Sequence, residues 1–284
     1  MQRPAHAAGD YLRTWRRRRR MSQLEFALEA EISQRHLSFM ESGRSRPSRD
    51  MLLHLADRLD VPFRDRNALL LAAGYAPVFA ERSLDDPALG PARQAIDLVL
   101  KGHEPFPALA VDRHWHLVAA NAALAPLLTG IEDKALLDQP INVLRLSLHP
   151  RGLAPRIANL SEWRSHLLDR LRRQSAISRD PVLADLLQEL SGYPAPEGLA
   201  TIHAPPHGDY GGVFVPLELI TEAGLLSFFS TTTVFGTPLD ITLSELAVEA
   251  FFPANAATAE ILGRIGVDRA PDAKETGAAI GRAR

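Results

Sequence analysis

The 284-residue sequence contains no cysteine. Disulfide bonds, thiolate metal sites and cysteine nucleophiles are therefore excluded. It also lacks any uncharged apolar run long enough to cross a bilayer, and the first residues, Met1–His6, lack the apolar core of a secretory signal. Hydrophobic residues nevertheless make up 46% of the chain, which is enough to build buried cores. We expect a cytoplasmic protein with no membrane segment.

The motifs of several common enzyme classes are absent too. The sequence has no G-x-S-x-G nucleophile elbow, no G-x-x-x-x-G-K-[ST] phosphate loop and no H-E-x-x-H metal site. His203, His207 and Asp209 resemble a metal-ligand set, but Pro205 and Pro206 prevent the helix that would align the two histidines. We therefore expect no enzyme, no catalytic residue, no metal site and no cofactor. An enzyme domain in the C-terminal half remains the less favoured alternative.

Charge is distributed unevenly along the chain. Residues 1–75 carry 14 basic and 9 acidic residues, a net +5, whereas the whole chain is −2 and the remainder is −7. The basic excess includes a run of five arginines, Arg16–Arg20. An N-terminal part that attracts phosphate, attached to an acidic remainder, favours nucleic-acid binding over a merely solvated helix face.

Residues 22–43 predict a helix-turn-helix. Ser22 and Glu25 form a capping box at the start of one helix, and Ser33 is an N-cap candidate for a second helix that ends at Gly43. The first helix has an apolar face formed by Leu24, Ala27 and Leu28. Two short helices joined by a tight turn are typical of proteins that contact the major groove of DNA.

This segment resembles the Cro/C1-type (XRE) helix-turn-helix superfamily of phage repressors. The matching residues are Arg16–Arg20, Met21–Glu25, the turn Ile32-Ser33, Leu37 and Glu41–Arg44. In that family Gln23 would bind a phosphate, the front of the second helix would face base edges, and the arginines after it would hold phosphates. The DNA-binding residues we expect are Arg16, Gln23, Ser33, Gln34, Arg35, Ser38, Arg44 and Arg46. Phe39 departs from the family pattern; we expect it to pack in the core, with contact to a thymine methyl group as the alternative.

Prolines and an acidic pair between Gly74 and Pro91 indicate a domain boundary. Beyond it, the sequence predicts a hairpin at residues 108–120, a short helix that Asn121 caps, helices at residues 156–174 and 181–190, and three strands at residues 213–220, 225–235 and 243–252. Two opening strands, a helical middle and three closing strands resemble a PAS-like α+β domain with an antiparallel sheet.

More specifically, the chain resembles the MmyB-like regulators, in which an XRE helix-turn-helix precedes a PAS-like ligand-binding domain. The matching segments are Arg35–Phe39, Arg44–Met51, Asn67–Gly74, Leu148–Leu153, Ser227–Pro238 and Thr242–Pro253. The resemblance extends over residues 9 to 262. It implies a bacterial, homodimeric transcription regulator that binds double-stranded DNA at a palindromic operator and accepts a fatty-acid-like ligand. The alternative is a C-terminal domain that serves only as a dimerisation platform.

The ligand-binding residues that we expect are Trp115, His149, Arg151, Phe214, Phe228, Thr232 and Phe251. The aromatic residues are apolar lining candidates, with an ordinary core position as the alternative. His149 and Arg151 are candidate anchors for a carboxylate head group, or else part of an exposed turn. Strand alternation separates Phe228 and Thr232 from Phe229, but apolar and hydroxyl residues on both faces leave the inward face open.

We therefore predict an α+β multidomain protein with an all-α N-terminal helix-turn-helix domain and a PAS-like C-terminal domain. The expected boundaries are 9–75 for the DNA-binding domain, 76–103 for a linker and connecting helix, 104–263 for the ligand-binding domain and 264–284 for a disordered tail.

Overall fold

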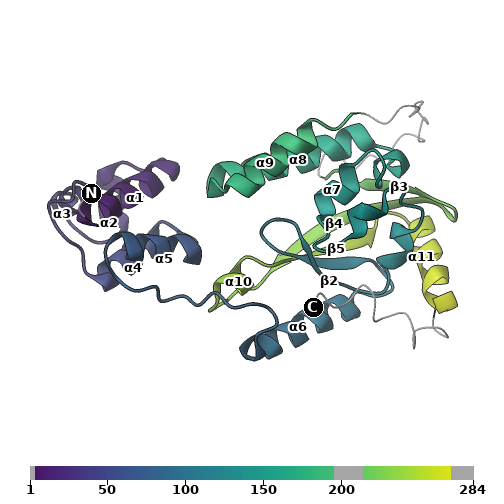
Figure 1. Ribbon diagram of the computed structural model, residues 1–284, viewed down its shortest axis with the longest axis horizontal. Helices are drawn as coiled ribbons and strands as arrows, with labels where there is room; N and C mark the ends of the chain where they lie inside the picture. Colours follow the sequence, from purple (N-terminus) through teal and green to yellow (C-terminus); the bar gives the residue numbers. More distant parts are fainter. Residues whose placement is uncertain (1–3, 195–213, 270–284) are drawn as a thin grey trace. The chain divides into compact units, whose positions relative to one another are not determined.

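The computed structural model describes residues 4–194 and 214–269, and the chain divides into two compact units (Figure 1). The first unit comprises residues 1–83 together with 237–244, and the second comprises residues 84–236 together with 245–284. The chain therefore passes between the units at three places, residues 83–84, 236–237 and 244–245. The expected two-domain layout is present, with a short insertion from the C-terminal half in the first unit.

The first unit is helical. Its elements are α1 (Pro4–Arg18), α2 (Gln23–Glu29), α3 (Gln34–Glu41), α4 (Arg49–Arg58), α5 (Phe63–Ala72) and the one-turn α10 (Ile241–Ser244). Its core is built from apolar side chains that are almost fully buried, including Leu12, Phe26, Leu37, Met40, Leu52, Leu55, Leu59 and Leu70. Between α2 and α3 the chain turns at Glu31, whose φ of 55° closes the tight turn. The predicted helix-turn-helix is confirmed.

The predicted apolar face of α2 is wrong at its two leucines and right at Ala27. Leu24 and Leu28 are 53% and 70% exposed, whereas Phe26 and Ala27 are buried. The single large aromatic side chain of this helix fills the core, and it directs the two leucines to the opposite side.

The second unit is built around a five-stranded antiparallel sheet in the order β2-β1-β5-β4-β3. The strands are β1 (Ala108–Val111), β2 (Leu117–Ala120), β3 (Leu217–Thr221), β4 (Gly224–Val234) and β5 (Ala247–Pro253). The two opening strands thus pair beside the last strand, which confirms the predicted α+β fold.

Helices cover both faces of this sheet (Figure 1). On one side lie α7 (Val143–Leu148), α8 (Leu160–Ser178) and α9 (Pro181–Ser191), and on the other lie α6 (Gly90–Gly102) and α11 (Ala256–Arg269). Short 3₁₀ turns occur at Pro87–Leu89, Ala125–Leu128, Lys134–Leu137 and Ala154–Arg156. The helix α6, expected as part of a linker, packs against β1, β2 and β5 and buries Ile96 and Leu100.

Several predicted element boundaries differ from the structure, among them the start of β3, which is Leu217 instead of residue 213. The long helix begins at Leu160 instead of residue 156 because the preceding segment is tied to β3: Ile157 forms a β-bridge with Leu219, and the Asn159 amide donates to the Pro216 carbonyl at 2.8 Å. The last strand begins at Ala247 because residues 241–244 form a helical turn. Helix α11 continues to Arg269, inside the expected disordered tail, and the rest of that tail lies outside the described residues.

The sequence predicted that Asn121 caps a short helix, and the structure shows that it does not. A turn follows it, and its buried amide instead donates to the carbonyls of Leu100 and Phe106, at 3.1 and 2.7 Å, while its Oδ1 accepts the Ala108 N–H at 3.0 Å. One side chain thereby joins the end of α6 to the first strand.

Candidate functional sites

Side-chain caps hold the two helices of the helix-turn-helix. Ser22 Oγ accepts the Glu25 N–H at 3.1 Å, and the Glu25 carboxylate accepts the Ser22 N–H at 2.6 Å, which confirms the capping box. At the start of α3, Ser33 Oγ accepts the His36 N–H at 3.1 Å. Each cap satisfies backbone amides that the helix itself leaves unpaired, and therefore fixes where each helix starts.

A buried ion pair joins α1 to the end of α3. The Arg16 guanidinium donates to both carboxylate oxygens of Glu41, at 2.6 and 2.9 Å, and Gln23 Nε2 donates to Glu41 Oε2 at 2.8 Å. Burial alone would raise the pKa of Glu41, but the hydrogen bonds from Arg16 and Gln23 and the nearby charges outweigh it and lower the pKa overall. The Arg16 side chain is 9% exposed, so this arginine lies within the domain and not on its surface.

The front of α3 is open to solvent. Ser33, Gln34 and Arg35 are exposed, and Ser38 is half-buried. The Arg35 guanidinium lies 5.3 Å from the centre of the Phe39 ring, which is half-buried beside it. Phe39 thus packs partly against the protein while its ring supports an exposed arginine.

The two arginines after α3 are also exposed, but they differ in their contacts. Arg46 Nη2 donates to the Ala73 carbonyl at 3.0 Å, and its guanidinium lies 5.5 Å from the Tyr75 ring centre. Arg44 is held through its backbone, whose N–H donates to the Phe39 carbonyl at 2.9 Å. Arg46 is therefore fixed in direction, whereas the Arg44 side chain extends from an anchored backbone.

A cavity of about 110 Å³ lies in the second unit between the sheet and the helices α7 and α8. Its wall is mainly apolar and includes Leu109, Trp115, Leu117, Leu127, Leu146, Trp163, Leu167, Leu219, Phe228 and Phe251. Strand alternation agrees with this placement: Phe228 and Ser230 of β4 face the cavity, whereas Phe229 stacks on Phe252 of β5 at 5.1 Å. The inward face of β4 is thus the face that carries Phe228.

Three of the expected ligand-binding residues line this cavity, namely Trp115, Phe228 and Phe251, and the other four lie elsewhere. Phe214 is 38% exposed and lies 5.6 Å from the Phe229 ring, and Thr232 is exposed near the end of β4. His149 lies edge-on to Tyr193 at 5.1 Å, and Arg151 forms an ion pair with Asp133. His149 and Arg151, the expected anchors for a carboxylate head group, therefore contact other side chains and do not line the cavity.

The polar part of the wall was not anticipated from the sequence. It is formed by Ser147, His166, Arg170, Ser230 and Glu249. Arg170 donates from Nη2 to Glu249 Oε1 at 2.5 Å and to Thr232 Oγ1 at 3.0 Å, and it lies 4.5 Å from the Trp115 ring centre. A signal was present in the sequence: Glu249 is a carboxylate inside an otherwise apolar strand, and such a group needs a buried partner.

Burial lowers the pKa of His166, and the charges of Arg170 and Arg173 lower it further. His166 is therefore neutral at neutral pH, and Arg170 supplies the positive charge at this polar end.

The proline-flanked set of His203, His207 and Asp209 lies outside the described residues. In the part of the chain that the structure describes, no helix has the length and apolar character needed to cross a membrane.

Comparisons with known proteins agree with this two-part arrangement. The family model of the MmyB-like transcription regulator ligand binding domain matches residues 92–265, and a helix-turn-helix family model matches residues 12–65. Among solved structures, the chain is similar to the clp gene regulator ClgR from Corynebacterium glutamicum. One crystal structure is 24% identical, with 26% of this chain and 92% of that chain covered and a TM-score of 0.24; another is 23% identical, with 37% and 97% covered and a TM-score of 0.23.

The comparison with curated proteins gave no match. The ligand-binding family model nevertheless spans more than half of the chain, and it begins at residue 92, near the start of α6. With a helix-turn-helix in the first unit and an apolar cavity in the second, the chain belongs to the MmyB-like transcription regulators and is a DNA-binding regulator with a small-molecule-binding domain.

Proposed function

We propose that this regulator binds its operator as a homodimer and changes its affinity for DNA when a fatty-acid-like ligand occupies the cavity. The observation that carries the proposal is the composition of the cavity wall. It is apolar over most of its surface and has one arginine, Arg170, among its few polar groups. An alkyl chain is stabilised by such a wall, by about 0.8 kcal/mol for each buried methylene.

Arg170 suits a carboxylate head group because part of its guanidinium is available. Both hydrogen bonds that it makes to the described residues come from Nη2. Nε and Nη1 can therefore donate to a ligand carboxylate, and charge-assisted bonds of this kind are the strong ones. Neutral His166 and the hydroxyl of Ser230 can add hydrogen bonds at the same end.

On the DNA side, we assign base contacts to Gln34, Arg35 and Ser38, at the exposed front of α3. Ser33, Arg44 and Arg46 are assigned to the phosphate backbone on either side. The Gln23 side-chain amide donates one N–H to Glu41, and its second N–H can donate to a phosphate. Arg16 positions this surface through Glu41, since its own side chain is buried.

Two copies are needed because a single module covers too few base pairs for high specificity. We assign them to the half-sites of a palindrome, with centres about 10 bp apart or a multiple of that. A ligand alters operator affinity only if it favours one arrangement of this dimer. The helix α6, which follows the first passage of the chain into the second unit, is the proposed route.

The ligand is tested with the full chain. Mass spectrometry of molecules extracted from native protein should find an acyl carboxylate. After delipidation, a long-chain fatty acid should shift the affinity for an operator selected in vitro by about 5- to 150-fold. Arg170→Gln should weaken fatty-acid binding, while Arg172→Gln, an exposed change on the same helix, should leave it intact. Equal binding by both variants would contradict the head-group assignment, and an unchanged operator affinity with ligand bound would contradict the switch.

DNA recognition is tested separately. Arg35→Ala should cost about 1–3 kcal/mol on the selected operator and much less on random DNA, because a bidentate contact to guanine is lost. Arg172→Ala in the second unit serves as the charge-matched control. Equal loss on both DNAs would reassign Arg35 to the phosphate backbone, and sedimentation of a monomer on the operator would contradict the dimer.

A further inference from the structure

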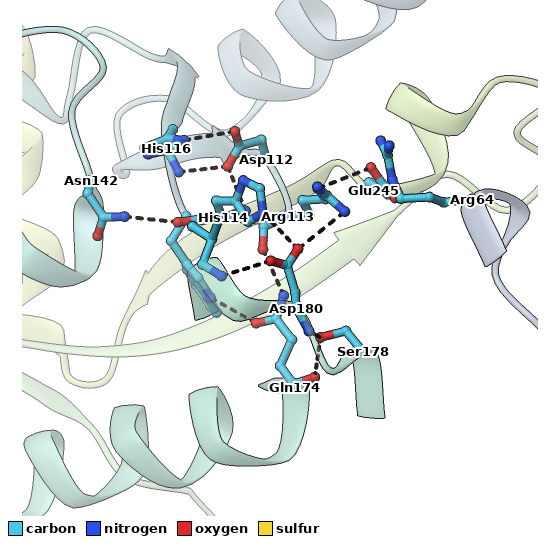
Figure 2. Close-up of polar contacts among 12 residues, drawn as sticks. Arg64, Asp112, Arg113, His114, His116, Asn142, Gln174, Ser178, Asp180 and Glu245 are labelled. Atoms are coloured by element: carbon cyan, nitrogen blue, oxygen red, sulfur yellow. Dashed lines mark hydrogen bonds and ion pairs between the residues drawn. The ribbon is translucent and has the colours of Figure 1, made fainter. Parts of the chain in front are cut away.

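The turn between β1 and β2 brings together side chains that the proposed DNA and ligand sites do not use (Figure 2). Asp112 Oδ1 accepts the backbone N–H groups of His114 and His116, each at 2.8 Å, and Asp112 Oδ2 lies 3.0 Å from His116 Nδ1. One donor atom from each of these three residues lies within 4.8 Å of the other two. The turn thus gathers two imidazoles and one carboxylate at a partly exposed place.

We propose that Asp112, His114 and His116 form a binding site for a divalent transition-metal ion, with Zn²⁺ as the best-suited ion. Nitrogen and carboxylate oxygen are the ligands that Zn²⁺ accepts where no thiolate is present, and this chain has no cysteine. Zn²⁺ with ligands at about 2.0–2.1 Å in tetrahedral geometry sets neighbouring donor atoms about 3.3 Å apart. The 3.0 Å between Asp112 Oδ2 and His116 Nδ1 is close to that spacing, and the donor atoms of all three residues lie within 4.8 Å of one another.

A second carboxylate orients His114. His114 Nε2 lies 2.8 Å from Asp180 Oδ2, and Asp180 in turn caps α9 by accepting the Val182 N–H at 3.0 Å. A metal-binding histidine commonly donates its other ring N–H to a carboxylate, which fixes the tautomer and the direction of the ring. Nδ1 is then the nitrogen left for the ion. Turn formation alone explains Asp112, but it requires neither histidine nor the Asp180 contact.

The surrounding charges also favour a cation. Arg113, the one base within the turn, lies between two carboxylates, 3.3 Å from Asp180 Oδ2 and 3.8 Å from Glu245 Oε2. Asp112 and Asp180 thus place two carboxylates beside the two imidazoles.

The site is linked to the cavity through the residue between the two histidines. Trp115 has a φ of 68°, is 6% exposed, and lines the cavity, where its Nε1 donates to Gln174 Oε1 at 2.9 Å. A metal on His114 and His116 would hold Trp115, and with it one wall of the cavity, in place. This effect on the cavity rests on the proposed function, whereas binding of the ion does not.

The test titrates untagged full-length protein, freed of metal with a chelator, with Zn²⁺ by calorimetry and with Co²⁺ by visible absorption. We expect one ion per chain. His114→Ala and His116→Ala should each lower the affinity at least tenfold, and Asp180→Asn, which preserves a capping side chain, should lower it about 10- to 100-fold. The double variant His203→Ala/His207→Ala and the variant His149→Ala are the matched controls and should bind as the wild type does.

Far-UV circular dichroism establishes that each variant is folded. If His114→Ala or His116→Ala does not fold, the wild-type titration and Asp180→Asn decide the question. No binding of either ion at 100-fold excess over protein, or undiminished binding in the His114, His116 and Asp180 variants, would overturn the proposal. Loss of binding in the His203/His207 double variant would move the site to that segment. Because the experiment measures metal binding, its result does not depend on whether the cavity binds a fatty acid.

Discussion

The ion pair between α1 and α3 gives the sharpest prediction for the DNA-binding unit. Glu41→Gln keeps nearly the same shape but removes the negative charge that Arg16 meets with two hydrogen bonds. The Glu41 side chain is fully buried and that of Arg16 is 9% exposed, so water cannot replace the missing partner. The variant leaves a buried guanidinium with one side-chain amide oxygen and the Met21 carbonyl, at 2.8 Å, as acceptors, and with no negative charge bonded to it.

Removing one partner of a buried ion pair costs about 3–5 kcal/mol, because the other charge is left uncompensated. For a unit of this size, 1 kcal/mol lowers the melting temperature by about 4–8 °C, so the shift should exceed about 12 °C. Arg16→Met/Glu41→Leu removes both charges and should lose less than the single change, since well-packed apolar residues can replace a buried pair. Glu29→Gln, an exposed change on α2, should stay within about 0.5 kcal/mol.

Urea unfolding of the full chain, followed by far-UV circular dichroism and by tryptophan fluorescence, measures these differences. Trp15 lies in the core of the first unit and reports its unfolding. A Glu41→Gln variant within 1 kcal/mol of the wild type would refute the reasoning, as would a double variant less stable than the single one. Either result would mean that the pair is solvated or that the helices are joined by apolar packing alone.

Three further predictions concern particular side chains. The pKa of Glu41 is lowered in the folded state, so its contribution is complete above about pH 4.5 and is lost as the pH falls through the folded pKa; acid unfolding curves should be steeper for the wild type than for Glu41→Gln. Gly9→Ala should destabilise the first unit by several kcal/mol in the same urea assay, since its Cβ would lie 2.5 Å from the Met40 carbonyl oxygen, and a loss under 1 kcal/mol would show that α1 can shift. Ser230→Trp should occupy the cavity and abolish fatty-acid binding in calorimetry, whereas Thr231→Trp, at an exposed position on the other face of β4, should not; similar effects of the two would contradict the strand facing described above.

Local signals in the sequence were sufficient for the first unit. The capping box of Ser22 and Glu25 and the cap of Ser33 involve residues three positions apart, so their chemistry is visible in a short window. The same short window did not identify the buried face of α2. Leu24 and Leu28 have helical spacing, and so do Phe26 and Ala30, which are the residues that are buried. Helical spacing gives the period of a face, but only the neighbouring helices decide which face is covered.

The cavity depended on contacts that a local reading does not contain. Arg170 and Glu249 are 79 positions apart, and the register of β4 against β5 brings Thr232 beside Glu249. The family resemblance predicted a ligand domain, and the side chains of His149 and Arg151 were candidate carboxylate anchors, with an exposed turn as the alternative. The structure places them outside the cavity wall, since α7 and the turn after it direct them elsewhere.

The segment at residues 237–244 bears on how this protein can be divided. It lies between two strands that both contribute to the cavity wall, yet it belongs to the helical unit, where Asp240 pairs with Arg82 at 3.0 Å and the Ile241 N–H donates to the Ala80 carbonyl at 2.8 Å. A gene cut after residue 83 would therefore yield a DNA-binding half that lacks the helical turn at residues 241–244. The sensor half would carry this segment without the residues that it contacts. Replacing the sensor on this helix-turn-helix therefore requires three junctions to be matched at once, at residues 83–84, 236–237 and 244–245.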